Sequence, residues 1–357
     1  PIIHLQRLNR EIESVCQELP GIAVTHFSKR CLIDEIVLTN SIEGVNSTRR
    51  EIKEILDEFG KKDTQKRFYG LVNKYRMLQN KEALSLSTCE DIRNIYNELV
   101  LQEVIEEDKN DFPDGRIFRK DSVTVYNSAG KEIHQGIYPE DKLIKTMEQA
   151  LCFLADDGYD VFIRIAGFHY LIGYIHPFYN GNGRLSRFIS SYLLAQELHP
   201  LVGYRLSYTI KKNISDYYAA FEECNDFRNK GDLTPFVIMF LDVLTQALEQ
   251  LLKALTERKI ELYRYLQNVG ESVLGVKSKE LLSYLVQASL FSELGISTLE
   301  LLDVLGISRA TLHNRLNSLK SISDQLVISQ RDGKEKYYRA NLKEVENLFQ
   351  STPPRGW

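Results

Sequence analysis

The architecture of this 357-residue chain follows from one segment, His176-Pro177-Phe178-Tyr179-Asn180-Gly181-Asn182-Gly183-Arg184-Leu185-Ser186-Arg187. An apolar helical segment at about 161–175 precedes it, and Pro177 disfavours helical geometry at His176, so we expect that helix to end at the histidine. Phe178 is placed to anchor the loop in the core. Gly181 and Gly183 allow backbone conformations that other residues avoid, and a helix of about 184–198 follows them. The segment therefore predicts a tight loop between two packed helices.

The chemistry of this segment suits a polyphosphate and a proton transfer. Backbone amides that converge at the start of a helix, with the positive end of its dipole, form an anion site. Arg184 and Arg187 are three residues apart, so they lie on one face of that helix. His176 adds an imidazole whose usual pKa, about 6.5, suits a base near neutral pH. The segment is not a Walker A loop, because Gly-Lys-Ser/Thr is missing, and no strand precedes it as in a dinucleotide fingerprint.

The segment resembles the signature of Fic-domain proteins, H-x-F-x-[D/E]-G-N-G-R-x-x-R, and the resemblance extends from about residue 35 to 250. It implies a mainly α fold with a Fic helical core and a β-hairpin flap. It also implies an adenylyltransferase that moves AMP from ATP to a protein Ser, Thr or Tyr hydroxyl. His176 would be the general base, the loop amides and Asn182 would hold the α- and β-phosphates, and Arg184 and Arg187 would bind the β- and γ-phosphates. The residues that the resemblance assigns to the nucleotide within the segment are Asn180, Gly181, Asn182, Gly183, Arg184, Leu185, Ser186 and Arg187.

The chain departs from the family at Asn180, which stands where the family has an acidic residue that binds Mg²⁺. An amide offers a carbonyl oxygen but no charge, and Mg²⁺ prefers carboxylate and phosphate oxygens. We therefore expect a weaker metal site and a slower or altered enzyme. The alternative is a catalytically weakened Fic protein that senses nucleotide and regulates through DNA or a protein partner.

A second motif, Thr39-Asn40-Ser41-Ile42-Glu43-Gly44, fits the family's inhibitory pattern [S/T]-x-x-x-E-[G/N]. Thr39 and Glu43 are four residues apart and face one way on a helix, and Gly44 can end that helix in a left-handed conformation. The resemblance implies an N-terminal inhibitory helix in which Glu43 pairs with Arg187 and keeps the γ-phosphate out. The alternative is a surface helix with a glycine cap.

Two further groups complete the site that the resemblance implies. Valines and isoleucines around residues 127–130 predict a β-hairpin at about 122–137. The resemblance implies that this hairpin is a flap, and that its residues Val123, Thr124, Val125 and Tyr126 border the nucleotide. Tyr217, Tyr218 and Asn225 resemble the residues that border the adenine, although an ordinary aromatic core pair would look the same. We expect His169 to be a hydrogen-bonded core histidine rather than a metal ligand, and Cys224 to be a buried thiol.

The last 90 or so residues follow the order of a winged helix-turn-helix. A helix at 297–305, a Gly306-Ile307-Ser308 turn, a helix at 309–319 and a hairpin at about 326–338 succeed one another. The segment 308–320 carries Arg309, His313, Arg315 and Lys320 and no acid, as a DNA-recognition helix does. A protein-docking or dimerising winged helix, including one that forms a homodimer, is the alternative.

The remaining elements are expected to be helical. Helices are predicted at 5–20, 27–43, 48–59, 65–80, 88–107, 140–155, 212–229 and 234–268, and Thr48 and Glu51 form a capping box. We expect three domains: an N-terminal helical region with the inhibitory helix over 1–110, a Fic core over 111–255, and a linker helix with the winged helix over 256–357.

Composition sets the broad class. Hydrophobic residues make up 43% and charged residues 26%, as in soluble globular proteins, and the net charge of −4 argues against coating of nucleic acid in bulk. Five cysteines without a C-x-x-C pattern favour a reducing cytoplasm over a disulfide framework. The first residues do not form a signal peptide, and we expect no apolar run of the ~18 residues that a membrane span needs.

Overall fold

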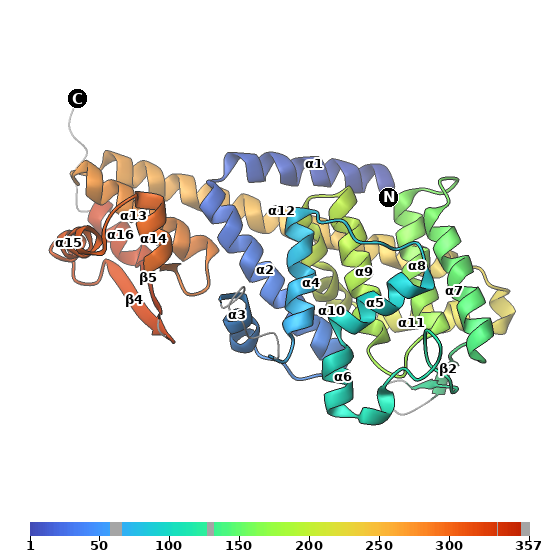
Figure 1. The fold of residues 1–357 in the computed structure, drawn as a ribbon. Coiled ribbons are helices and arrows are strands. Elements are labelled where there is room, and N and C mark those ends of the chain that lie inside the picture. The colour runs from blue at the N-terminus through green and yellow to red at the C-terminus, as the bar shows by residue number, and fades with distance from the viewer. Residues whose placement is uncertain (58–65, 127–131, 334, 351–357) are drawn as a thin grey trace. The chain divides into compact units, whose positions relative to one another are not determined.

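The computed structural model describes residues 1–57, 66–126, 132–333 and 335–350. This part of the chain is mainly helical, with two small antiparallel sheets (Figure 1). It divides into two compact units, one of Pro1–Ile12 and Cys31–Leu251, the other of Glu13–Arg30 and Leu252–Trp357. The loop at 176–187 belongs to the first unit.

The helices and strands up to the candidate site and just beyond it are α1 (Ile2–Glu18), α2 (Gly21–Ile42), α3 (Arg49–Asp57), α4 (Tyr69–Asn80), α5 (Cys89–Leu99), α6 (Leu101–Glu107), η1 (Lys109–Asp111), β1 (Thr124–Tyr126), β2 (Glu132–Gln135), α7 (Glu140–Ala155), α8 (Val161–Ile175), α9 (Asn182–Glu197), η2 (Pro200–Tyr204), α10 (Leu206–Lys212), α11 (Ile214–Asn225) and η3 (Phe227–Asn229). The elements that follow are α12 (Thr234–Glu271), α13 (Val276–Phe291), β3 (Ile296–Ser297), α14 (Thr298–Leu305), α15 (Arg309–Lys320), β4 (Val327–Asp332), β5 (Glu335–Ala340) and α16 (Leu342–Gln350).

Helix α8 lies between α7 and α9, and it positions the loop at 176–187 (Figure 1). Its sequence is apolar on nearly all sides, which is the pattern of a helix buried in the core. Asp160 caps its first turn, because its Oδ1 accepts a hydrogen bond from the Phe162 amide at 2.9 Å. The helix ends at His176 as expected, but the histidine is left-handed (φ 52°, ψ 64°) and not extended as Pro177 suggests. Histidine is one of the few residues that adopts this conformation with some frequency.

Helix α9 starts at Asn182, two residues earlier than expected. Gly181 has φ 78°, a left-handed conformation that favours glycine, and no side chain caps the helix there. Gly183 has ordinary helical geometry, so the expected backbone freedom is used at Gly181 alone. The amides of the first helical turn have no carbonyl partners within the helix, as at any helix start.

Of two further expected elements, the capping box at Thr48 is present and the long helix over 88–107 is divided. Thr48 and Glu51 form the predicted capping box, with the Thr48 amide donating to Glu51 Oε2 at 2.8 Å and the Glu51 amide donating to Thr48 Oγ1 at 3.2 Å. The helix expected over 88–107 is interrupted at Val100, which leaves helical geometry at φ −139°. Helices α10 and α13 add to the expected set.

The hairpin is present, with β1 and β2 antiparallel and Val125 paired with His134. The register shifts between Val125 and Tyr126. The tip at 127–130 and the side chains of Tyr126 and Ile133 lie outside the described residues.

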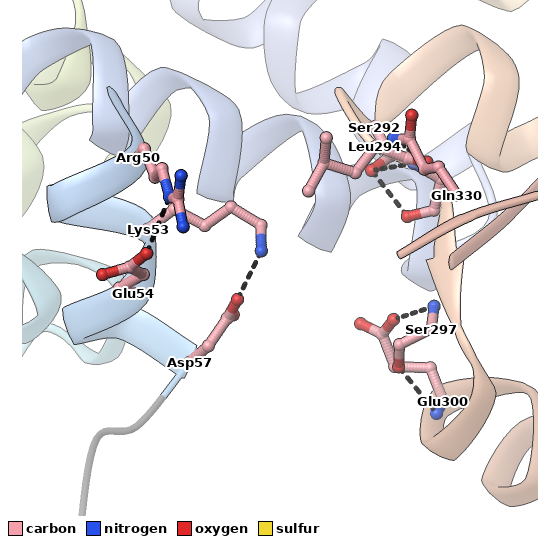
Figure 2. Close-up of polar contacts among 10 residues, drawn as sticks. Arg50, Lys53, Glu54, Asp57, Ser292, Leu294, Ser297, Glu300 and Gln330 are labelled. Carbon is pink, nitrogen blue, oxygen red and sulfur yellow. Dashed lines mark hydrogen bonds and ion pairs between the residues drawn. The ribbon is translucent and has the colours of Figure 1, made fainter. Parts of the chain in front are cut away.

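The second unit contains the expected succession of helix, turn, helix and hairpin. Figure 2 shows the capping box that starts α14, in which the Ser297 amide donates to Glu300 Oε2 at 2.8 Å and the Glu300 amide donates to Ser297 Oγ at 3.1 Å. Gly306 ends α14 with φ 60°, and Ser308 caps α15. The sheet has the strand order β3-β5-β4, and β3 and α16 add to the expected elements.

Helix α12 corrects one expectation. By length and mean hydropathy (1.4 over its most apolar 18 residues) it could cross a membrane, whereas the sequence led us to expect no such segment. The core helix of a globular domain passes the same test, and 44% of that window is buried within the protein. Phe236, Phe240 and Leu248 on α12 are fully buried.

Glu35, on α2, leads to a prediction about stability and pH. It is fully buried and accepts the Ser207 amide, and burial raises its pKa to about 7 despite that bond and the positive charges of Arg187 and Arg205. The folded state therefore holds a proton that the unfolded chain has released, so stability falls as the pH rises from about 4.5 to about 7. We expect Glu35→Gln to raise the free energy of unfolding at pH 8 by about 1–3 kcal/mol, with the gain shrinking toward pH 4.5. Urea denaturation at the two pH values checks this, and an equal effect at both would contradict it.

Candidate active site

Internal contacts fix the loop at 176–187 from both sides. The Asn182 side chain accepts the Phe178 amide at 3.0 Å and donates to the Phe178 carbonyl at 2.8 Å. The Phe178 ring is fully buried and stacks on Tyr96, with ring centroids 3.6 Å apart. Phe178 thus anchors the loop as expected. The Asn182 side chain, which the resemblance assigns to the phosphates, bonds the Phe178 backbone and holds the loop together.

Arg184 is the most unusual cation in the site. Its side chain is fully buried, and none of its three guanidinium nitrogens has a hydrogen-bond partner among the described residues. A buried charge without partners costs several kcal/mol unless an anion compensates it. The orphaned guanidinium lies on the first turn of α9, where the helix dipole also favours an anion.

Arg187, one turn further along α9, by contrast has hydrogen bonds at Nε and Nη2 of its guanidinium. Its Nε donates to Thr39 Oγ1 at 2.8 Å, and its Nη2 donates to the Thr39 carbonyl at 3.1 Å and to Glu43 Oε1 at 2.8 Å. The contact expected between Glu43 and Arg187 is therefore present. Burial alone would raise the pKa of Glu43, but Arg187, with Arg184 and His176, holds it below its ordinary value. Glu43 is thus a carboxylate at neutral pH.

The Glu43 carboxylate lies directly over the start of α9. A Cβ atom at Gly183 would overlap Glu43 Oε1, so the glycine leaves room for an anion against the backbone. Gly44, which follows, has φ 75° and ends the turn after α2 as expected. Glu43 therefore occupies the anion position that the uncapped helix and the two arginines create.

His176 lies at the end of α8, and a buried arginine that the sequence pattern does not single out holds its backbone. Arg119 donates from Nε to the His176 carbonyl at 2.8 Å and from Nη2 to the Ile137 carbonyl at 3.0 Å. Burial, and then the charge of Arg119, lower the pKa of His176 to about 4. The imidazole is therefore neutral at physiological pH, with a lone pair to accept a proton.

The hairpin meets the same loop. The Ile137 amide donates to the Ile175 carbonyl at 3.1 Å, and the Gly136 amide donates to the Val123 carbonyl at 2.9 Å. Val123, Thr124 and Val125 are half-buried. These bonds place the hairpin beside His176.

The three residues that the resemblance assigns to the adenine differ in exposure and in hydrogen bonding. Tyr217 is buried and its hydroxyl is 2.8 Å from His169 Nε2, Tyr218 is 39% exposed, and Asn225 Oδ1 accepts the Tyr170 hydroxyl at 2.6 Å. Of the three, Tyr218 is the side chain with an open face.

His169 is a core histidine, as expected. It is fully buried between the Tyr217 hydroxyl and Ser190 Oγ, each at 2.8 Å, and burial lowers its pKa to about 3. Ser186 Oγ lies 3.3 Å from the same imidazole, and Leu185 is fully buried, so both side chains point into the core.

Cys224 is a buried thiol, as expected, and burial raises its pKa.

Asn180 has three polar contacts. Its Oδ1 accepts the Gly181 amide at 2.7 Å, its carbonyl accepts the Tyr96 hydroxyl at 3.1 Å, and its Nδ2 donates to Asp111 Oδ2 at 3.2 Å. An amide oxygen has a second lone pair, so Oδ1 together with nucleotide phosphates suits Mg²⁺. Within the described ranges, no group of three or more His, Cys, Asp or Glu side chains could hold a metal by itself.

On α15, the basic residues expected to contact DNA differ in whether their side chains are exposed or bonded within the protein. Arg309 and His313 are exposed, and Lys320 is half-buried. Arg315 is directed elsewhere, because its Nη1 donates to Glu280 Oε2 at 2.8 Å.

Part of the chain is similar in sequence to known proteins. The model of the Fic/DOC family matches residues 86–194. The protein adenylyltransferase Fic of Drosophila willistoni is 30% identical over 118 residues, which are 32% of this chain and 22% of that protein. The match thus spans about a fifth of that relative's length.

A solved structure shows the same fold. A Fic family protein from Desulfovibrio desulfuricans G20 aligns over 99% of this chain and 97% of that chain, with a TM-score of 0.55 and 20% identity. A fragment of Fic-1 from C. elegans aligns over 71% of this chain and 72% of that chain, with a TM-score of 0.49 and 20% identity. Residues 86–194 are therefore similar to the Fic/DOC family, and the chain shares the fold of a solved Fic family protein.

Proposed function

We propose that this chain is a self-inhibited protein adenylyltransferase that moves AMP from ATP to a Ser, Thr or Tyr hydroxyl of a protein. The observation that carries the proposal is Arg184, a fully buried guanidinium without a hydrogen-bond partner among the described residues, at an uncapped helix start. A polyphosphate supplies the anionic hydrogen-bond acceptors that this guanidinium lacks among the described residues.

In the proposed reaction, neutral His176 takes the proton of the target hydroxyl. The hydroxyl oxygen forms a bond to the α-phosphorus of ATP, and the bond to the bridging oxygen breaks to release pyrophosphate. Arg184 and the amides of the first α9 turn stabilise the phosphate charge, which is the largest part of catalysis in such transfers. When bound, Mg²⁺ would neutralise charge on the phosphates, and the Asn180 side-chain oxygen would help to hold it. The hairpin is proposed to hold the target chain beside His176 by strand addition.

We propose that Glu43 is the inhibitor, because it satisfies Arg187 at 2.8 Å and covers the start of α9. Glu43 then occupies Arg187 Nη2, which the γ-phosphate would otherwise bind, so ATP binds poorly or unproductively. The motif Thr39–Gly44 and the contact agree with the inhibitory helix that the sequence suggests.

Labelling with ATP radioactive at the α-phosphate tests the proposal. The wild type, Glu43→Gly and Glu43→Gly with His176→Ala are compared for self-modification, and γ-labelled ATP is the control for phosphate transfer. We expect label from α-labelled ATP alone, strongest in Glu43→Gly and lost with His176→Ala. Absence of label in Glu43→Gly with ATP and either Mg²⁺ or Mn²⁺ would refute the enzyme and favour the nucleotide-sensing alternative.

The pH dependence of labelling follows from His176. Because its pKa is lowered to about 4, the neutral base is present throughout the neutral range. We expect the initial rate of Glu43→Gly to differ by less than about twofold between pH 5.5 and 7.5. A histidine with the ordinary pKa of about 6.5 would instead give a drop of roughly tenfold over this range, and that drop would contradict the assignment.

A second, independent proposal concerns α15 of the second unit. We infer that it binds DNA, because its exposed side chains other than Ala310 are basic or polar and none is acidic, while Leu312, Leu316 and Leu319 are buried beneath. The helix-turn-helix and following strands have the order of a winged helix. We expect an electrophoretic shift that weakens steeply with salt and that Arg309→Ala reduces. The exposed Arg331 lies on β4 and not on α15, so Arg331→Ala should reduce the shift less. No salt-dependent shift would favour protein docking.

A further inference from the structure

Asp111 stands directly beside the residue at which the chain departs from its family. Asp111 Oδ2 accepts a hydrogen bond from Asn180 Nδ2 at 3.2 Å, although the two residues are 69 apart in sequence. A carboxylate is thus present next to position 180, supplied by another segment. The local sequence marks Asp111 only as part of a turn.

The segment that carries Asp111 is firmly held. Asp108 caps the η1 turn, with its Oδ1 accepting the Asn110 amide at 2.9 Å. Arg93 donates to the Pro113 and Ile117 carbonyls, at 3.3 Å and 2.6 Å. Glu140 accepts three consecutive amides, those of residues 116–118, at 2.8–2.9 Å. Asp111 is therefore placed by contacts on both sides of it, and not only by Asn180.

Asp111 and Arg184 both lie close enough to Tyr96 to affect its ionisation. Both charges act on Tyr96: burial raises the pKa of this phenol, Arg184 opposes the rise and Asp111 adds to it. The Tyr96 hydroxyl in turn donates to the Asn180 carbonyl at 3.1 Å. The Asp111 carboxylate and the Asn180 side chain thus lie beside Tyr96, close to a buried guanidinium that has no hydrogen-bond partner among the described residues.

We propose that Asp111 supplies the charge that Asn180 lacks, so that the Asp111 carboxylate and the Asn180 amide together form the divalent-cation site of the bound nucleotide. The inference rests on the proposed binding of a nucleotide at Arg184. One carboxylate, one amide oxygen and two phosphates form an oxygen set that Mg²⁺ accepts. The Asn180 amide already has a suitable orientation, because Nδ2 holds Asp111 while Oδ1 keeps a second lone pair.

Calorimetric titration of ADP into the full chain with Glu43→Gly tests the inference without measuring activity. Each variant is titrated in Mg²⁺ and in EDTA, and the ratio of the two dissociation constants reports how strongly the metal supports the nucleotide. The variants are Asp111→Asn, Asn180→Asp and the double exchange Asp111→Asn with Asn180→Asp. Asp114→Asn is the matched control, because it removes a charge from the same segment but bonds Tyr179 and Lys120 instead of Asn180.

We expect Asp111→Asn to reduce the Mg²⁺ support about tenfold or more, with little change in EDTA, and Asp114→Asn to leave it unchanged. The double exchange should restore it, because the carboxylate returns on the other side of the same pair. Equal Mg²⁺ support in Asp111→Asn and the parent would overturn the inference while leaving nucleotide binding intact. Absence of ADP binding under both conditions would overturn the proposed function and this inference with it.

Discussion

Glu43→Gly is expected to raise transfer from α-labelled ATP by roughly 10²-fold. The substitution removes the carboxylate that satisfies Arg187 Nη2 and that covers the Gly183 backbone. A guanidinium made available to a phosphate is comparable to one oxyanion donor, whose removal costs about 10²–10³ in rate. The rate of self-modification at a fixed ATP concentration is the measurement.

The same substitution should lower the stability of the protein. A rise in transfer would then come from freeing Arg187 and not from a more stable fold. Arg187 is 1% exposed and keeps its two bonds to Thr39, so we expect a loss of about 1–3 kcal/mol. Glu43→Gln is the matched control, since it retains the volume over Gly183 without the charge. It should activate less than glycine does. Unchanged labelling in Glu43→Gly would show that the ion pair is structural and not inhibitory.

Arg184→Met is expected to have opposite effects on stability and function. The arginine is fully buried without a partner among the described residues, so an apolar side chain of similar length should raise the free energy of unfolding by about 1–3 kcal/mol. In the Glu43→Gly background it should also lower transfer by about 10³-fold, because the phosphates lose their buried cation. Thermal unfolding and labelling are measured on the same preparation.

Arg119→Met is the matched control for this prediction. Arg119 is equally buried, but it donates to the carbonyls of His176, Asp121 and Ile137. Its loss should therefore destabilise the protein by leaving those carbonyls without their partner. If Arg184→Met destabilised as much as Arg119→Met, Arg184 would be a structural residue and the main support for the nucleotide site would be lost.

The sequence predicted those features that depend on neighbouring residues. The end of α8 at His176, the left-handed Gly44 and the Thr48 capping box are local, so a few side chains and backbone angles determine them. The resemblance also led us to expect the contact of Glu43 with Arg187. It did not show the state of Arg184, because a missing partner is a property of the folded surroundings.

Other features could not be derived, because they join distant segments. Arg119 reaches carbonyls at Ile137 and His176, and Asp111 meets Asn180 across 69 residues. Nothing in the local pattern around Arg119 marks it as buried, and Asp111 has the sequence context of an ordinary turn. The helical periodicity also misses α10, which has seven residues, because so short a segment shows barely two turns.

The position of Glu43 just beyond the end of α2 has a consequence for how the proposed enzyme would respond to its substrate. Arg187 remains fixed by Thr39 when Glu43 leaves, so release requires one side chain on a short turn to move, not a helix to unfold. Glu43 and the γ-phosphate then compete for one nitrogen. The apparent affinity for ATP is proportional to the fraction of molecules in which Glu43 has withdrawn, so it falls as that fraction falls. Each additional ~1.4 kcal/mol in the ion pair shifts the half-saturating ATP concentration tenfold upward. Any change near Glu43 that weakens this ion pair would therefore lower the ATP concentration at which the proposed enzyme becomes active.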